Sequence, residues 1–357
     1  MKDRFGLSDG ELALLLFLVP LVAGGGSLAA GALSGRFGSA PVLRVAGPLV
    51  PLAVLAVGAA PTLPLLVAAL VAVGLGLGSV DATMSMQGVQ YQEASGRPAV
   101  NGFYAVWSLA GILGAVAASV AADSGWSLAT FFAVVAVVLV PADLLAGPGL
   151  LGRGSHQPVV DATGGPGQVP WRPILVLGAA VTALFVADST TSNWSAVYLT
   201  DALGSSESVA ALAYAGYATA MLAGRVLGDW LVARLGPVTL VRTGGLVATA
   251  AVLLLVAAPG PGLGLVGFAL LGLGLCVVLP QAFVAAAAWD PRGSGVAVAR
   301  VNVFNYLGFL VGAPLVGVLA ELASLRAAIA VLVPVTLVIV WLAGSFAVPA
   351  ASLRAAP

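Results

Sequence analysis

Charged residues are scarce in this chain. Lysine and arginine together number 14 and aspartate and glutamate another 14 among 357 residues, which is 8% of the sequence. About a quarter of the residues are charged in an ordinary soluble domain. The formal net charge is zero and no basic block interrupts the sequence. The composition therefore excludes a soluble globular domain and gives no reason to expect a nucleic-acid partner.

Cysteine and histidine are almost absent. Cys276 is the only cysteine, so no intrachain disulfide can form. His156 is the only histidine and lies in a hydrophilic stretch with no cysteine beside it, so we interpret it as a solvated linker residue. No GKS/T nucleotide motif and no nucleophile with a suitable base is found. We therefore expect no metal, no cofactor, no enzymatic activity and no ATP-driven pump.

Apolar residues make up 60% of the chain, with a mean hydropathy of +1.09. They occur in runs of about 20 residues, the length of a membrane-spanning helix, whereas barrel strands have about 10 alternating residues. Helices also satisfy every backbone group internally, as lipid requires. We predict an all-α membrane protein with eleven spans: 9–33, 40–59, 65–86, 98–121, 127–149, 173–194, 207–231, 238–258, 262–286, 296–319 and 327–348.

The sequence repeats itself at an offset of 198 residues. The offset pairs Arg36 with Arg234, Gly38 with Gly236, Pro61 with Pro259, Gly74 with Gly272, and Gly114 with Gly312. One ungapped offset that works at separated places indicates an internal duplication. We predict two pseudo-symmetric helical bundles, with five spans in 1–150 and six in 173–348. A cytoplasmic linker at 151–172 joins them, and a cytoplasmic tail follows at 349–357.

Arginines indicate the orientation, because cytoplasmic loops carry the excess of basic residues. This rule places the turns of Arg36 and Arg234 inside and the amino terminus outside. Residue 1 aligns with residue 199, so the span at 173–194 has no counterpart in the first bundle. We therefore expect a plan of twelve helices whose first helix is missing, through a misplaced start codon or a truncation. A cleaved signal peptide is the alternative interpretation of the first segment.

Ionisable groups at membrane depth are costly, which makes them functional candidates. Asp81 and Asp188 lie within predicted spans, and either could carry a proton if buried away from a fixed cation. A structural hydrogen bond to a neighbouring helix is the alternative for both. Asp143, near Pro141, is interpreted as structural.

Two polar stripes lie at helical spacing in repeat-related spans. One comes from the span at 98–121 and the other from the span at 296–319, and transporters bind substrate near the midplane at the repeat interface. Hydrogen bonds between helices are the alternative role. Together with isolated polar residues of other spans, the predicted substrate-binding residues are Asn101, Tyr104, Trp107, Ser108, Asp188, Asn193, Gln281, Asn302, Asn305 and Tyr306.

Residues 31–38, GALSGRFG, resemble the loop signature of the major facilitator superfamily, and residues 228–236, GDWLVARLG, resemble its second copy. Residues 101–108 and 188–199 are similar to a bacterial branch related to fucose-type sugar permeases. The resemblance implies a multi-pass transporter in a bacterial cytoplasmic membrane, which we expect to be a monomer. It also implies a gate on the cytoplasmic side formed by Arg36, Gly38, Arg225, Asp229, Arg234 and Gly236.

The family signature usually carries an acid where Gly35 and Ala233 stand, and that acid helps to close the inner gate. Asp229 lies one turn earlier in the second copy, four residues after Arg225, so the two share a helical face. An Arg225–Asp229 pair could take over part of the closure, and the first copy has nothing comparable.

These features predict secondary active transport of a small solute by alternating access of the two bundles. The amides and aromatic rings favour a polar, neutral or weakly charged solute such as a sugar, with proton coupling through Asp188 or Asp81. The partners are then this solute, protons and the lipid bilayer. Two alternatives remain: efflux of drugs or metabolites by proton antiport, and a membrane sensor or scaffold that does not transport.

Overall fold

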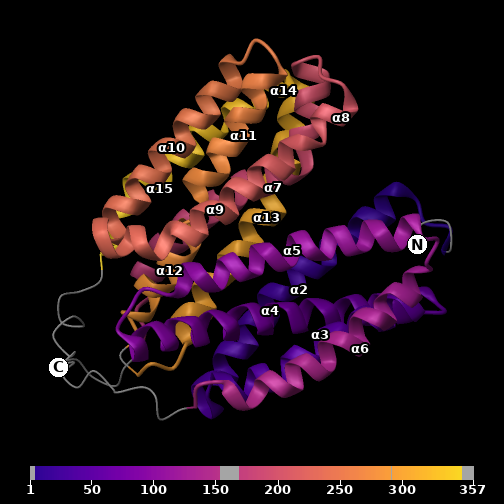
Figure 1. Ribbon diagram of the computed structural model, residues 1–357, viewed down its shortest axis with the longest axis vertical. Helices are drawn as coiled ribbons and strands as arrows, with labels where there is room; N and C mark the ends of the chain where they lie inside the picture. The colour runs from indigo at the N-terminus through magenta and orange to yellow at the C-terminus, as the bar shows by residue number, and fades with distance from the viewer. Residues whose placement is uncertain (1–4, 153–168, 291, 348–357) are drawn as a thin grey trace. The chain divides into compact units, whose positions relative to one another are not determined.

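The computed structural model describes residues 5–152, 169–290 and 292–347. Within these ranges every regular element is a helix, and eleven helices are long and apolar enough to cross a membrane (Figure 1). The predicted all-α membrane fold is therefore confirmed. Most of the predicted linker with His156, and the tail at 349–357, lie outside the described residues.

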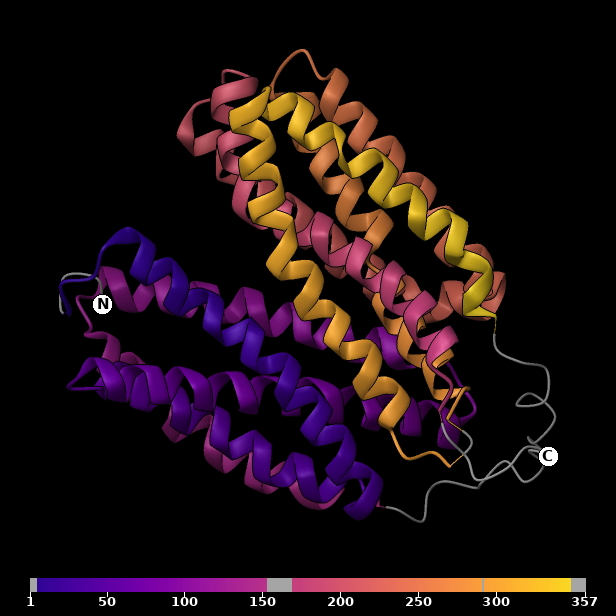
Figure 2. The same cartoon turned by 180° about the vertical axis from the view of Figure 1, so that it is seen from behind.

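The first five spanning helices are consecutive in the chain. They are α2 (Asp9–Phe37), α3 (Ser39–Ala59), α4 (Leu63–Ser95), α5 (Val100–Asp123) and α6 (Leu128–Ala146), which the short helix η1 (Gly147–Gly149) follows. α3 packs against α2 and α6, and α3 and α6 run side by side in both views (Figures 1 and 2).

The second group contains six spans, some of them interrupted. Its elements are α7 (Trp171–Val197) with η3 (Tyr198–Ala202), α8 (Glu207–Ala210) with α9 (Leu212–Leu235), α10 (Pro237–Ala257), α11 (Pro261–Leu275) with α12 (Val278–Ala287), α13 (Val296–Leu322), and α14 (Leu325–Ala330) with α15 (Leu332–Leu342) and η4 (Ala343–Phe346). α10 packs against both α11 and α15, and α9 packs against α11.

The predicted spans match these helices apart from interruptions and shifted ends, and two of these differences have a clear physical reason. α4 continues past its predicted end at residue 86 as far as Ser95. Hydropathy falls there because the residues turn polar, but Gln87 is buried and binds Leu151 through both its amide oxygen (2.8 Å) and its amide nitrogen (3.0 Å). A side chain that is hydrogen-bonded inside the protein lets the helix remain buried without being apolar.

The predicted span at 262–286 is broken between α11 and α12, at Cys276 and Val277. Pro280 explains the break, because proline has no N–H to donate to the carbonyl four residues earlier and its ring crowds that carbonyl. The break leaves Gln281 in the first turn of α12, in a buried position.

The internal duplication is visible in how the helices approach one another. Glycines related by the offset of 198 face residues that are related by the same offset. At each of these glycines the neighbouring helix is so close that an added Cβ would collide with the facing residue. The repeat-related pairs of contacts are Gly74–Val19 with Gly272–Tyr217, Gly76–Val50 with Gly274–Ala248, and Gly26–Leu75 with Gly224–Leu273. The two predicted bundles are therefore pseudo-symmetric in packing as well as in sequence.

The chain divides into two compact units whose membership does not follow the sequence halves. Unit 1 holds the described parts of 1–94, 110–169 and 290–306, and unit 2 those of 95–109, 170–289 and 307–357. α5 therefore passes from unit 2 to unit 1 after Leu109, and α13 passes from unit 1 to unit 2 after Tyr306. The first part of α5 thus packs in unit 2 and its remainder in unit 1, whereas the first part of α13 packs in unit 1 and its remainder in unit 2.

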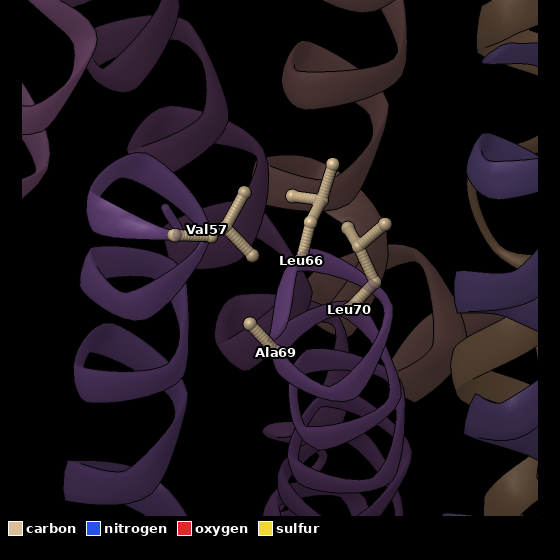
Figure 3. Packing of buried hydrophobic residues seen from close by; sticks show 5 residues of the cluster. Val57, Leu66, Ala69 and Leu70 are labelled. Atoms are coloured by element: carbon tan, nitrogen blue, oxygen red, sulfur yellow. The ribbon is translucent and has the colours of Figure 1, made fainter. Parts of the chain in front are cut away.

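A small apolar cluster closes one end of α3 and α4 in unit 1. Val57 lies in the last turn of α3, and Ala60 directly follows that helix. They pack with Leu66, Ala69 and Leu70 from the start of α4 (Figure 3). The cluster fixes the α3–α4 turn and so the direction in which α4 carries Asp81.

Candidate functional site

Asp81 on α4 is the centre of a polar network in unit 1. The hydroxyl of Tyr306 on α13 donates to its Oδ2 at 3.0 Å, and the amide nitrogen of Asn305 lies 3.5 Å from the same oxygen. Both partners come from the predicted stripe on α13. The structure thus brings a predicted proton-carrying residue together with predicted substrate-binding residues.

The network continues along α13 to α2. Asn305 donates to the amide oxygen of Asn302 (2.5 Å), Asn302 donates to Ser27 (3.2 Å), and Ser27 donates to the carbonyl of Ala299 (3.0 Å). We call Asp81, Ser27, Asn302, Asn305 and Tyr306 the Asp81 network. Sequence analysis missed Ser27, although the offset of 198 pairs it with Arg225 and could have singled it out.

Most of the Asp81 network is shielded from solvent, and one acceptor in it is unused. Asn302 and Asn305 are both buried, and the Oδ1 atom of Asn305 has no hydrogen-bond partner among the described residues. A buried acceptor without a partner costs about 1 to 3 kcal/mol, so a hydroxyl or amine donor brought to it would be bound favourably. The network can hold a proton on Asp81 and can accept hydrogen bonds from a polar ligand.

Asp188 on α7 has a different environment, in unit 2. The hydroxyl of Tyr217 on α9 donates to its Oδ1 at 2.7 Å, and the ring of Tyr214 stacks on that of Tyr217 with centroids 5.9 Å apart. Arg225, further along α9, interacts with Asp188 electrostatically. Asp188 thus has a tyrosine hydroxyl as its donor, with an arginine further along the same partner helix, whereas the donors to Asp81 are an amide and a phenol.

Arg225 has only 8% of its side chain exposed, although it lies within a spanning helix. One of its terminal nitrogens contacts Ser108 at 2.5 Å and the carbonyl of Tyr104 at 3.4 Å. Its guanidinium carbon lies 5.4 Å from the centre of the Tyr104 ring, and that ring also stacks with Phe283 on α12. The predicted stripe on α5 is therefore held by Arg225.

Asp229 contacts the beginning of α5. One carboxylate oxygen accepts from the backbone N–H and the side-chain amide of Asn101, at 3.0 and 2.9 Å, and the other accepts from the N–H of Gly102 at 2.9 Å. We expected Asp229 to pair with Arg225 on its own helix. In the structure the two residues each turn to α5, because the unbonded amides at its start attract the carboxylate.

The other predicted substrate residues lie outside these two groupings. Trp107 is 42% exposed, and Asn193 is exposed and donates to the carbonyl of Ser189 on its own helix (2.8 Å). The neighbouring Trp194 donates from its indole nitrogen to the carbonyl of Ala313 on α13 at 3.0 Å. Trp194 therefore joins α7 to α13 by a specific hydrogen bond.

The two predicted gate turns have the same geometry. Gly38 has φ 92° and ψ 159°, Gly236 has φ 75° and ψ 159°, and each donates its N–H to the residue four positions earlier. Positive φ favours glycine. The guanidinium carbon of Arg36 lies 5.2 Å from the centre of the Phe37 ring, and that of Arg234 lies 4.2 Å from the centre of the Trp230 ring. Both turns therefore have an arginine placed over an aromatic ring.

Metal ligands do not cluster in the part of the chain that the structure describes. No group of three or more histidine, cysteine, aspartate or glutamate side chains there could hold an ion. The acids at membrane depth are paired instead with amides, hydroxyls and backbone N–H groups.

Comparison with known protein families gives one match, the Major Facilitator Superfamily, over residues 176–356. Among curated proteins, the uncharacterized transporter y4wD of Sinorhizobium fredii is 34% identical over 91% of this chain and 86% of its own length. An uncharacterized transporter of this type from Yersinia pestis is 32% identical over 92% of this chain and 84% of its own. Membrane protein MosC of Rhizobium meliloti is 28% identical over 95% of this chain and 82% of its own length.

Solved structures share the fold at lower identity. The transporter FucP, crystallised in an outward conformation, matches with a TM-score of 0.78 and 16% identity over 97% of this chain and 92% of its own. The proton:xylose symporter XylE matches with a TM-score of 0.74 and 14% identity, over 94% and 86%. At such identities the likeness establishes the arrangement of helices and nothing about the solute.

Proposed function

Because the chain belongs to the Major Facilitator Superfamily, we propose that it is a secondary active transporter that moves a small polar solute together with protons. It is an integral membrane protein with multiple spans, and its relatives are named transporters. Since those relatives are bacterial, we place it in a bacterial cytoplasmic membrane.

The Asp81 network is the observation that carries this proposal. It joins an acid on α4 to hydroxyl and amide groups of α13, and these partners are neutral. An acid with neutral partners can gain and lose a proton without opposing a fixed charge. The unused acceptor on Asn305 and the amide of Asn302 suit a solute that offers hydroxyl groups, such as a sugar.

Arg225, Tyr104 and Ser108 are a second proposed solute-binding group, in unit 2, which also holds Asp188. α4 and α5 belong to the first sequence repeat and α9 and α13 to the second, so both groupings draw on both repeats. Binding residues drawn from both repeats are what alternating access requires, because solute must be passed from one arrangement of the repeats to the other.

Two of the fold neighbours are described as sugar symporters, which gives a first choice of solutes to test. FucP is described as a fucose:proton symporter, and XylE as a proton:xylose symporter. We therefore propose a neutral sugar or polyol as the solute. Efflux of an amphiphile by proton antiport is the second candidate, favoured by the fold similarity to a human organic anion transporter with a TM-score of 0.69.

Solute counterflow in proteoliposomes tests the proposal. Vesicles holding purified protein are preloaded with an unlabelled solute, and entry of the same labelled solute is followed for fucose, xylose, inositol and an amphiphilic anion. Transient accumulation of a sugar or polyol is expected. Accumulation of the amphiphile alone would support efflux. Raised thermal stability with a solute but no exchange would indicate a sensor and contradict transport.

A further inference from the structure

Arg225 places a fixed positive charge inside a spanning helix, with most of its side chain buried. A guanidinium stays protonated and offers five N–H donors. The hydrogen bonds of Arg225 to described residues all start from Nη1, which contacts Ser108 at 2.5 Å and the carbonyl of Tyr104 at 3.4 Å. Within the described part of the chain, Nε and Nη2 therefore have donors to offer to a further partner.

The Nε atom of Arg225 is buried, and no described residue accepts a hydrogen bond from it. A buried donor of a charged group that is left unused costs free energy. Nε and Nη2 each direct an N–H from the same edge of the planar guanidinium, at a spacing that matches the two oxygens of one carboxylate. The edge best suited to a carboxylate is thus the edge that α5 does not use.

Two acids lie near Arg225, and neither is hydrogen-bonded to it. Asp229, one turn later on α9, directs both carboxylate oxygens to N–H groups at the start of α5. Asp188 accepts from Tyr217 at 2.7 Å and interacts with Arg225 only electrostatically among the described residues. A buried charge is costly unless it is paired and hydrogen-bonded, so this cation favours an anion brought by a ligand.

Helix packing at this position does not require an arginine. The offset of 198 pairs Arg225 with Ser27 and Tyr104 with Asn302. In unit 1, Asn302 donates to Ser27 at 3.2 Å, so a hydroxyl and an amide join α2 to α13 at the repeat-related positions. A charged group at membrane depth is expensive and is by default a functional candidate. The cation of the second repeat therefore points to a ligand.

Aromatic rings lie on both sides of this position. The guanidinium carbon is 5.4 Å from the centre of the Tyr104 ring, and that ring stacks with Phe283 at 6.1 Å. Tyr214 lies three turns before Arg225 on the same face of α9, stacks on Tyr217 and is 45% exposed. Small-molecule sites combine apolar and aromatic side chains with a few polar groups that orient the ligand. These surroundings suit an organic anion with a ring.

We propose that Arg225 binds the carboxylate of an acidic sugar, such as a uronate, through Nε and Nη2. The inference rests on the proposed function and extends it, because acidic sugars then bind in addition to neutral ones, and more tightly. A monoanion is the matching ligand. A phosphate dianion on a single guanidinium would leave an excess of buried negative charge, which is costly.

A matched set of solutes tests the proposal on the wild type, through thermal stability in lipid nanodiscs. Glucuronate is xylose with an added carboxylate, and glucuronamide carries a neutral amide in its place. We expect glucuronate to reach half of its full effect at a concentration about tenfold or more below that of glucuronamide or xylose, as one charged contact provides. No stabilisation by glucuronate, equal half-saturation by glucuronate and glucuronamide, or tighter binding of glucose 6-phosphate than of glucuronate would each overturn the proposal.

Variants of Arg225 connect this preference to one side chain. Arg225→Lys keeps the charge but loses the paired donors, so the affinity for glucuronate should fall about tenfold. Arg225→Gln loses the charge as well, and a fall of about a hundredfold is expected, with the affinity for xylose changed less than about threefold. A purely structural role would lower stability and leave the ratio of the two affinities unchanged, which would overturn the proposal.

Arg326→Gln is the matched control. Arg326 lies in another spanning segment of unit 2 and donates to the carbonyls of Val256, at 2.9 Å, and Ala202, at 3.4 Å. Its loss should lower stability without altering the preference for glucuronate, and an equal loss of preference in this control would contradict the role of Arg225. If Arg225→Gln does not yield monodisperse protein, Arg225→Lys and the solute series on the wild type still decide.

Counterflow of labelled xylose and glucuronate separates this proposal from the proposed function. A wild type that exchanges xylose but neither binds nor exchanges glucuronate supports sugar transport and overturns the carboxylate contact. A wild type that exchanges neither solute, but is stabilised by glucuronate in a way that requires Arg225, counts against transport and supports the carboxylate contact.

Discussion

The two acids at membrane depth lie in contrasting surroundings. Asp81 in unit 1 is bound by an amide and a phenol, whereas Asp188 in unit 2 is bound by a phenol and interacts with Arg225. The residue that the repeat places opposite Arg225 is Ser27, which is neutral. Duplication therefore supplied one scaffold, and substitution at a few positions gave unit 1 an acid among neutral groups and unit 2 an acid beside a cation.

This difference assigns separate roles to the two acids. A group that exchanges protons works best when neither of its charge states is strongly stabilised by a fixed neighbour. Asp81 meets that condition better than Asp188. We expect Asp81 to carry the proton, and Asp188 to orient Tyr217 by accepting from its hydroxyl.

The largest expected effect comes from placing an acid where α2 packs on α13. Gly31→Asp puts a charged side chain at a position where even an added Cβ would lie 2.5 Å from the Cβ of Ala299. The substitution therefore forces α13 to move and buries a charge. We expect a loss of about 3 kcal/mol or more in the free energy of unfolding. Thermal unfolding in nanodiscs measures it.

Gly35→Asp is the control, because a Cβ there has its nearest neighbours at 3.7 Å, on Val296, and 3.9 Å, on Ser294. It also restores the acid that the family signature carries. A Gly31→Asp protein that unfolds at the same temperature as Gly35→Asp would show that α2 and α13 are not closely packed.

Removing the cation should cost more than removing its neutral counterpart. Arg225→Ala deletes a charged hydrogen bond to Ser108 and the interaction with the Tyr104 ring, about 2 to 3 kcal/mol together. Ser27→Ala deletes one neutral hydrogen-bonding group, about 1 kcal/mol. Denaturant titration of both variants compares them, and equal losses would mean that charge does not distinguish the contacts.

The phenols that donate to the two acids should also differ. Tyr217→Phe removes the hydroxyl bond of 2.7 Å to Asp188, and we expect a loss of about 2 kcal/mol because no second donor to that carboxylate is found among the described residues. Tyr306→Phe removes a bond of 3.0 Å to Asp81, which keeps the amide of Asn305, so about 1 kcal/mol is expected. The same unfolding assay measures both variants, and a larger loss of unfolding free energy for Tyr306→Phe than for Tyr217→Phe would contradict this ranking.

The smallest effect concerns a helix that is capped by its own residues. At the start of α2, Glu11 accepts from the N–H and the hydroxyl of Ser8, and these hydrogen bonds lower the pKa of Glu11 below its usual value. A lowered pKa means that the cap stabilises the helix at neutral pH and is lost as the pH falls through the folded value.

Glu11→Gln should therefore raise amide exchange at the start of α2 slightly at pH 7, and the difference from the wild type should disappear once Glu11 is protonated in acid. A difference that persists unchanged in acid would mean that the carboxylate charge is irrelevant there. This local cap contrasts with the cap of α5, which comes from another helix.

Most of the fold could be predicted because lipid imposes simple rules. Runs of about 20 apolar residues located all eleven spans, and the offset of 198 predicted the paired turns at Gly38 and Gly236. The helix ends were harder to predict where polar residues stay buried, as at Gln87, and where proline interrupts a span, as at Pro280.

The site could be predicted only in part. Helical spacing placed Asn302, Asn305 and Tyr306 on one face, and the structure adds that this face meets Asp81. Spacing along one helix could not show that Asp229 would turn from Arg225 to the start of α5. That outcome depends on where α5 begins and on how closely α9 approaches it, which are properties of the packing.

Solute-dependent proton movement in proteoliposomes tests the central claim most directly. A pH-sensitive dye inside the vesicles reports protons that enter when fucose or xylose is added outside, for the wild type, Asp81→Asn and Asp188→Asn. We predict a solute-dependent signal in the wild type, its loss in Asp81→Asn with counterflow retained, and its persistence in Asp188→Asn. Proton movement that is unchanged in Asp81→Asn would contradict the account.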